Sequence, residues 1–219
     1  EEYDQRFKAS VDELVSFLDN EEIISVRDYM APALRAKIGS FSLAPTDGPR
    51  GFFYEVSYRD PVAMRTHSFH WTEIARMEHE PHASPIRRGP SLFNVWGQRS
   101  EGLATGMEEW MMHAGLFEGR PRGMEIIQIM LAQRAARALG GLMMHGEDYT
   151  IEQASEFAAR WTPRGWMPAD SDTVLTEQHL YLQQPGYGTS YIIGKIEIEK
   201  LIAERGLELG AGFTIKGFM

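Results

Sequence analysis

The apolar stretch Met124–Met144 constrains the fold of this chain more than any other part of the sequence. It is rich in Ala, Leu and Met and has little polar interruption. A helix that is apolar nearly all round its circumference is typical of a buried position, where other helices surround it. We therefore expect a mainly helical fold, a helical bundle in which this segment is buried.

Further helices are predicted by apolar side chains that recur every three or four residues. Residues 3–19 carry such a face, formed by Phe7, Val11, Leu14 and Leu18. Thr150 is placed to cap a later helix, with Gln153 at the capping-box position. The other helices are expected near residues 62–80, 101–114, 124–144, 173–182 and 190–205.

A few short β-strands are expected in the N-terminal third. Ile23–Val26 is a short extended segment, and the aromatic-rich run Phe52–Tyr58 favours a strand. We expect a single domain over residues 1–219. Residues 1–60 would hold an N-terminal helix and the short strands, and residues 61–219 a helical region that resembles a catalytic domain.

Composition excludes several classes of partner and chemistry. The formal net charge is -9 and no basic stripe with interleaved aromatic residues occurs, so neither nucleic acid nor an anionic membrane surface is an expected partner. There is no cysteine, which excludes disulfides, thiol nucleophiles and thiolate zinc sites. No apolar run approaches the roughly 20 residues that span a bilayer. We expect a soluble protein, with the cytoplasm and the periplasm both open.

Four of the seven histidines lie within sixteen positions, with carboxylates beside them. They are His67, His70, His79 and His82, and the nearby carboxylates include Glu73, Glu78 and Glu80. His67 and His70 are three residues apart and would share a helix face, as would His70 and Glu73. Imidazoles and a carboxylate from one helix, completed by a ligand from a later helix, are typical of a zinc site, and Glu101 is the candidate from the later helix. No HExxH motif occurs, so surface histidines beside solvated carboxylates stand as the alternative.

A second candidate group consists of Arg137, His145 and Tyr191. Arg137 interrupts the apolar segment, and a buried arginine needs an acceptor because an unpaired buried charge is costly. It belongs either to an active site or to a structural ion pair, for which the candidate partners are Glu101, Glu108 and Glu177. Tyr191 follows a glycine-rich turn, and its phenol could donate a hydrogen bond to a developing oxyanion. The alternative for Tyr191 is an ordinary half-buried tyrosine.

Three blocks of residues 101–200 carry a resemblance to a known family. They are Glu101-Gly-Leu-Ala-Thr-Gly-Met-Glu-Glu with Gly115-Leu116, then Arg134-Ala-Ala-Arg137 with His145 and Thr150–Ala154, and last Pro185-Gly186 with Ser190–Ile198. In order and spacing they resemble the segments EGWALYxE…GL, RAxRL…DxGxH…(T/S)xEQA and PGQAxSYxxGxxEI of a bacterial family, the domain-of-unknown-function 885 family (DUF885). The chain resembles the C-terminal part of that family.

The resemblance implies a helical, gluzincin-like metallohydrolase whose metal site resembles an HE…PGHH segment completed by the glutamate of EGWA. It makes Glu101 the candidate third ligand and His70 the counterpart of the first histidine. It makes Tyr191, Arg137 and His145 candidate polar groups of the same cleft. The chain departs from the pattern, because Trp71 follows His70 where the family has Glu, and Tyr187 stands for the Gln of PGQA. His79 or His82 would have to replace the PGHH histidines.

Three functional hypotheses follow. The first is a diverged metal-dependent hydrolase or lyase for a small or peptide-like substrate, with zinc or another divalent metal held by His70, Glu101 and His79 or His82. Glu73 would be its general base, and Tyr191 with Arg137 would stabilise negative charge. The second is a metal-free acid–base enzyme in the same cleft. The third is a non-catalytic subunit, because the chain is shorter than typical members and a partner chain could supply a missing N-terminal half. A homo-oligomer is also open.

Overall fold

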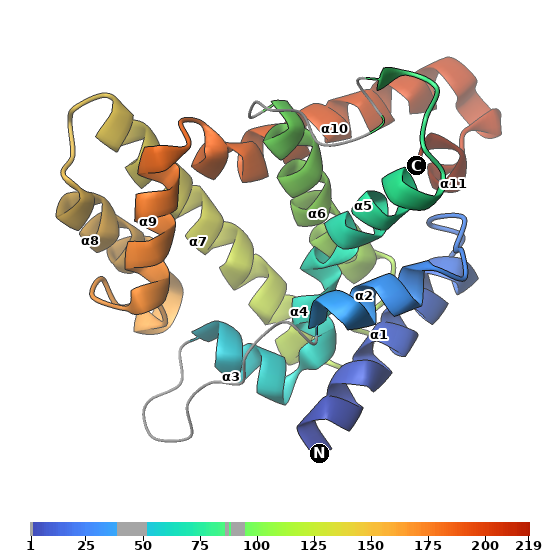
Figure 1. The fold of residues 1–219 in the computed structure, drawn as a ribbon, viewed down its shortest axis with the longest axis horizontal. Coiled ribbons are helices and arrows are strands. Elements are labelled where there is room, and N and C mark those ends of the chain that lie inside the picture. The colour runs from blue at the N-terminus through green and yellow to red at the C-terminus, as the bar shows by residue number, and fades with distance from the viewer. Residues whose placement is uncertain (1, 39–51, 86–87, 89–94) are drawn as a thin grey trace.

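The computed structural model describes residues 2–38, 52–85, 88 and 95–219, and all of its regular structure in these ranges is helical (Figure 1). The mainly helical fold class is therefore confirmed. The helices are α1 (Glu2–Asn20), α2 (Met30–Ile38), α3 (Phe52–Arg59), α4 (Pro61–His67), α5 (Phe69–His79), α6 (Val95–His113), α7 (Pro121–His145), α8 (Ile151–Trp161), α9 (Asp172–Gln183), α10 (Tyr187–Leu209) and α11 (Ile215–Phe218).

The expected short strands are wrong in both places. Ile23–Val26 lies in the irregular connection between α1 and α2, where Ile23 and Ile24 are buried. Phe52–Tyr58 lies in α3, which buries Phe52 and Val56, two residues four positions apart. In a strand Tyr54 would share one face with Phe52 and Val56, but Tyr54 is exposed while the other two are buried. This pattern of burial fits a helix and not the strand that the aromatic composition favours.

The helix predicted over residues 62–80 is interrupted at Ser68. Asp60 caps α4 by accepting a hydrogen bond from the backbone N–H of Ala63, and Pro61 occupies the first helical turn. Ser68 ends α4 and begins α5. His67 is therefore the last residue of α4, and His70 lies in the first turn of α5. The two histidines meet across a helix junction and not along one continuous face.

The longest helix, α7, runs through the middle of the molecule, with α8 and α9 to its left and α1, α2 and α5 to its right in Figure 1. One large apolar cluster joins the N-terminal helices to α6 and α7. The α7 helix is not buried all round, because Leu139 and Leu142 are exposed. None of the helices described in the structure has both the length and the apolar character needed to cross a membrane.

Two features anticipated from local sequence are present in the C-terminal half. The capping box of α8 forms, with the Thr150 hydroxyl accepting from Gln153 N–H and the Gln153 side chain accepting from Thr150 N–H. The helix expected near residues 190–205 is part of α10. Helix α10 packs against α6 with backbone in contact, since a Cβ added at Gly102 would lie 2.5 Å from Gly194 Cα. This close approach brings the first turns of α10 beside Glu101.

Candidate metal centre

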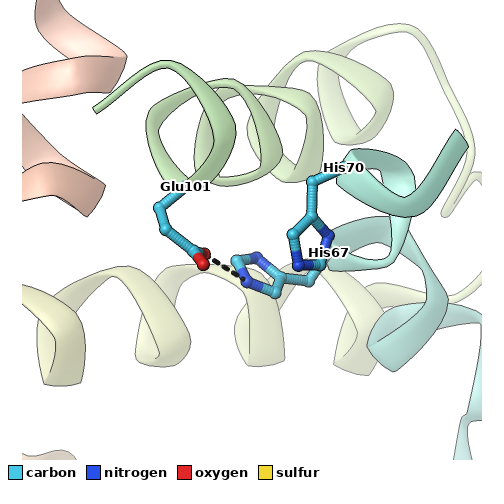
Figure 2. A group of neighbouring side chains, drawn as sticks. All are labelled: His67, His70 and Glu101. Atoms are coloured by element: carbon cyan, nitrogen blue, oxygen red, sulfur yellow. Dashed lines mark ion pairs between the residues drawn. The ribbon is translucent and has the colours of Figure 1, made fainter. Parts of the chain in front are cut away.

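Three side chains from consecutive helices converge at the junction of α4 and α5. His67 ends α4, His70 begins α5 and Glu101 projects from α6, and Figure 2 shows their polar ends turned toward one another. Each residue offers one ligand atom, and these atoms all lie within 4.8 Å of one another. Glu101 is buried and the two histidines are partly buried. Two imidazoles and one carboxylate form a donor set that zinc enzymes use.

The two oxygens of Glu101 have different surroundings. Oε1 accepts a hydrogen bond of 2.6 Å from the Tyr187 hydroxyl. Oε2 is buried, lies 3.3 Å from His67 Nε2 and has no further hydrogen-bond partner among the described residues. Buried polar atoms without partners are uncommon in folded proteins. A lone pair of Oε2 is therefore available to a cation at this point.

A buried ion pair lies on the other side of His67. His67 Nδ1 is 3.0 Å from Glu108 Oε1, and Glu108 lies two turns after Glu101 on α6. Both carboxylate oxygens of Glu108 accept from Arg134 of α7, in one case at 2.8 Å. The Arg134 guanidinium also lies 5.7 Å above the ring of Tyr191. The imidazole of His67 is thus held between two carboxylates, and one of them is neutralised by an arginine.

The pKa values of the three converging groups reflect burial and these neighbours. Burial opposes the charged form of Glu101, but the hydrogen bond and charge of His67, with the charge of His70 and the hydrogen bond from Tyr187, lower its pKa to about 2. Burial, followed by the charge of His67, lowers the pKa of His70 to about 4. Burial and Arg134 act to lower the pKa of His67, but Glu108 and Glu101 outweigh them and raise it.

The charge balance of this cluster favours a cation. Glu101 and Glu108 are both held ionised, while Arg134 supplies one positive charge, so the three leave one negative charge beside two imidazoles. The carboxylates of Glu101 and Glu108 lie 3.3 and 3.0 Å from the two nitrogens of His67, and together they raise its pKa. A metal ion would provide positive charge at this point in place of a proton.

Two tyrosines from the first turns of α10 border the cluster. The rings of Tyr187 and Tyr191 lie 5.8 Å apart, and the ring of Tyr191 lies 6.0 Å from that of His67. Burial first, and then the charge of Glu101, raises the pKa of both phenols. Both are therefore neutral hydrogen-bond donors at physiological pH. Tyr187 uses its hydroxyl on Glu101, which places Tyr191 as the second phenol of the site.

The structure separates His79 from the cluster. His79 lies nine residues after His70 on α5, about 13 Å along the helix. Its ring stacks on Tyr29 at 4.3 Å. His82 lies beyond the end of α5, where its Nδ1 accepts from the Ser84 N–H at 2.9 Å. His67 therefore stands in the position that the sequence offered to His79 or His82.

The remaining predicted residues have other contacts. Glu73, one turn beyond His70 on α5, accepts a hydrogen bond of 2.6 Å from Arg99. Arg137 forms a buried ion pair with Glu177 of α9, one of the three structural partners considered from the sequence. His145 ends α7 and lies 2.9 Å from the Tyr181 carbonyl oxygen through Nε2. It is eleven residues beyond Arg134, about 16 Å along α7, which places it away from the cluster.

Sequence reasoning gave no functional role to Glu108, Arg134 or Tyr187. A signal for Glu108 existed, because it follows Glu101 by seven residues and so lies on the same face of a helix two turns later. Tyr187 stood out only as a departure from the PGQA pattern. Arg134 belonged to the block that resembles RAxRL, but its pairing with Glu108 had no local signal because the two residues come from different helices.

Comparison with known proteins gives one match. A family model described as "Bacterial protein of unknown function (DUF885)" matches residues 8–218. The match includes the N-terminal helices as well as the three blocks between residues 101 and 200. No match was found among curated proteins or among solved structures.

Proposed function

The chain belongs to the bacterial DUF885 family, and we propose that it is a diverged metal-dependent hydrolase or lyase whose divalent metal ion is held by His67, His70 and Glu101. The observation that carries the proposal is the convergence of these three side chains on one buried point. The buried Oε2 of Glu101 supports it, because its polar neighbour is the proposed ligand His67 and a metal ion would satisfy the lone pair that remains.

Zinc is the first choice of metal. Two histidines and one glutamate form the protein ligand set of several catalytic zinc sites, in which a fourth position is open to water or substrate. A zinc ion in such a site polarises a carbonyl group or lowers the pKa of a bound water. The chain's own side chains supply the remaining functions.

We assign roles to the neighbouring side chains from their positions. Tyr187 holds Oε1 of Glu101 and leaves Oε2 for the metal. Tyr191, whose phenol stays protonated, is the candidate donor to negative charge that develops on a small or peptide-like substrate. Glu73 is the candidate proton acceptor, since it lies one turn beyond His70 and its side chain is 12% exposed. The Arg99–Glu73 ion pair would have to open for Glu73 to act.

Metal stoichiometry and affinity test this proposal. Zinc bound per chain would be measured by elemental analysis, and its affinity by competition with a chromophoric chelator. The wild-type protein should bind about one zinc ion. His70→Ala and Glu101→Gln should each weaken binding by at least about 100-fold, because each removes a direct ligand. His79→Ala is the matched control and should bind like the wild type. A wild-type protein that binds no zinc after incubation with excess metal would refute the proposal.

A metal-free acid–base enzyme is the second candidate, favoured by one contact chain. Tyr187 donates to Glu101, and Glu101 contacts His67 at 3.3 Å, so a proton could be exchanged among these groups without a metal. Activity that survives a chelator and disappears in His67→Ala would favour this candidate. Activity lost with the chelator and restored by zinc would favour the first.

A further inference from the structure

The Glu108–Arg134 ion pair is a buried polar contact beside the candidate metal site, yet neither residue is one of the three proposed ligands. Glu108 is 1% exposed and Arg134 is 4% exposed. The guanidinium binds the carboxylate through two nitrogens, a geometry that fixes the orientation of both groups. The carboxylate oxygen Oε1 lies 3.0 Å from His67 Nδ1.

This contact bears on which nitrogen of His67 can bind a metal. A neutral imidazole carries its proton on one nitrogen and a lone pair on the other. A carboxylate beside Nδ1 favours the proton there, which leaves the lone pair on Nε2. His67 Nε2 is the nitrogen that faces Glu101, at 3.3 Å from Oε2. The orientation of the ring and the position of its proton thus both direct Nε2 into the cluster.

Arg134 is needed for Glu108 to act in this way. An isolated carboxylate buried to this degree would be expensive to keep ionised. Arg134 offsets that cost and comes from α7, whereas Glu108 comes from α6 and His67 from α4. The three side chains therefore join three helices. Arg134 also lies 5.7 Å over the ring of Tyr191. The same guanidinium therefore neighbours both the carboxylate of Glu108 and the phenol that is the candidate hydrogen-bond donor to a substrate.

We propose that Glu108 and Arg134 are positioning residues that hold His67 with its proton on Nδ1 and present Nε2 to the metal. This inference rests on the proposed function, because it concerns the affinity of the same metal site. Hydrogen-bond partners of metal-bound histidines change metal affinity by roughly 10- to 100-fold when they are removed. The pair should therefore set how tightly the site binds its metal, without contacting the metal.

The test compares zinc affinity in two neighbouring variants of the full chain. Glu108→Gln should weaken zinc binding about 10- to 100-fold. Glu109→Gln is the matched control, because Glu109 is the next residue on α6 but pairs with Lys195 at 2.8 Å. The control should bind zinc like the wild type. Equal affinity in wild type and Glu108→Gln would overturn the inference alone, whereas a wild type that binds no zinc would overturn the proposed function as well.

A second variant covers the case in which Glu108→Gln fails to fold, since it leaves Arg134 buried without its charge partner. In Glu108→Leu combined with Arg134→Met the whole pair is replaced by apolar side chains, a change that proteins often tolerate. This double variant should give the circular dichroism spectrum and cooperative melting of the wild type, with zinc affinity reduced about 10- to 100-fold. Wild-type affinity in the folded double variant would overturn the inference.

Nitrogen NMR of the zinc-loaded wild type gives a readout that a purely structural ion pair would not affect. Two-bond proton–nitrogen spectra distinguish a protonated ring nitrogen from a metal-bound one. His67 should show a proton on Nδ1 and zinc on Nε2, and His67→Ala identifies its signals. Zinc on Nδ1 of His67 would overturn the inference whatever the variants do.

Discussion

Substitution of Gly102 by alanine should destabilise the protein although alanine is the better helix former. Gly102 lies in α6, where it faces α10. An added Cβ would stand 2.5 Å from Gly194 Cα and 2.6 Å from Lys195 N. Ordinary contact between carbon atoms requires roughly 3.5 Å or more, so the helices would have to separate by about 1 Å. Both contacting atoms belong to the backbone, so no side-chain rotation can relieve the overlap.

The size of the effect follows from two opposing terms. Overpacking of a well-packed contact costs about 1–3 kcal/mol, and the upper end applies because backbone atoms must move. Replacing a helical glycine by alanine stabilises the folded protein by about 0.8–1.0 kcal/mol. The free energy of unfolding should therefore fall by about 2 kcal/mol, which for a chain of this size lowers Tm by about 4–8 °C.

The same movement should reach the candidate metal centre. Tyr187 lies on α10 and donates to Glu101 on α6 at 2.6 Å. A separation of about 1 Å would stretch this contact beyond the usual range of an O–H···O hydrogen bond. Gly102→Ala should therefore bind zinc more weakly than the wild type, in addition to melting at a lower temperature.

Calorimetry or thermal circular dichroism on metal-free protein measures the change in Tm. Gly206→Ala is the matched control, because Gly206 lies in α10 with no atom within 4 Å of an added Cβ. It should raise stability by up to about 1 kcal/mol. If Gly102→Ala melts at or above the temperature of Gly206→Ala, then α6 and α10 are not in backbone contact and the reasoning fails.

Three further predictions concern single residues. In the folded protein the pKa of His70 is lowered from 6.5 to about 4, so the unfolded chain takes up a proton first as the pH falls. The free energy of unfolding of the metal-free protein should therefore decrease as the pH is lowered from about 6.5 to about 4. Urea denaturation at a series of pH values should show that the free energy of unfolding decreases less steeply with falling pH in His70→Gln than in the wild type. An equal decrease in both proteins would contradict the lowered pKa of His70. Glu177→Gln leaves the buried guanidinium of Arg137 without its charge partner and should lower the free energy of unfolding by about 3–5 kcal/mol. Arg137→Met leaves a partly exposed Glu177 and should lower it by less. Denaturant titrations that give the opposite order would refute the pairing. Thr150→Ala removes the hydroxyl that caps α8 and should lower the free energy of unfolding by about 1 kcal/mol. Thr173→Ala, within α9, is the control for removal of a threonine. An unchanged denaturation midpoint for Thr150→Ala would show that the cap contributes nothing to stability.

Local sequence sufficed where the physical cause is local. The capping box at Thr150 depends on contacts within four residues, and the periodic apolar face of α1 depends on a single helical repeat. The prediction of strands failed at Phe52–Tyr58, where aromatic composition favoured a strand but Tyr54 is exposed between the buried Phe52 and Val56, as in a helix. Which side chains are buried is decided by the neighbouring helices, and composition does not carry that information.

The candidate site was predictable in part, because His70, Glu101 and Tyr191 stood out from motif spacing and from resemblance. The choice between His67 and His79 was not open to sequence reasoning. It depends on the interruption at Ser68, which sets the end of α4 against the start of α5, and on the length of α5, which carries His79 away. A continuous helix over residues 62–80 would have given a different geometry.

By itself, the sequence determined that this chain is a mainly helical protein of the DUF885 family, and it predicted a metal site built from histidine and glutamate residues. Periodicity, caps and motifs are properties of short segments, so they survive without a tertiary structure. Only the tertiary structure decided that His67 lies between Glu101 and Glu108, and that Arg134 neutralises Glu108. These contacts join α4, α6 and α7, and the distances between helices are fixed by packing, including the glycine contact of α6 with α10, which no local pattern encodes.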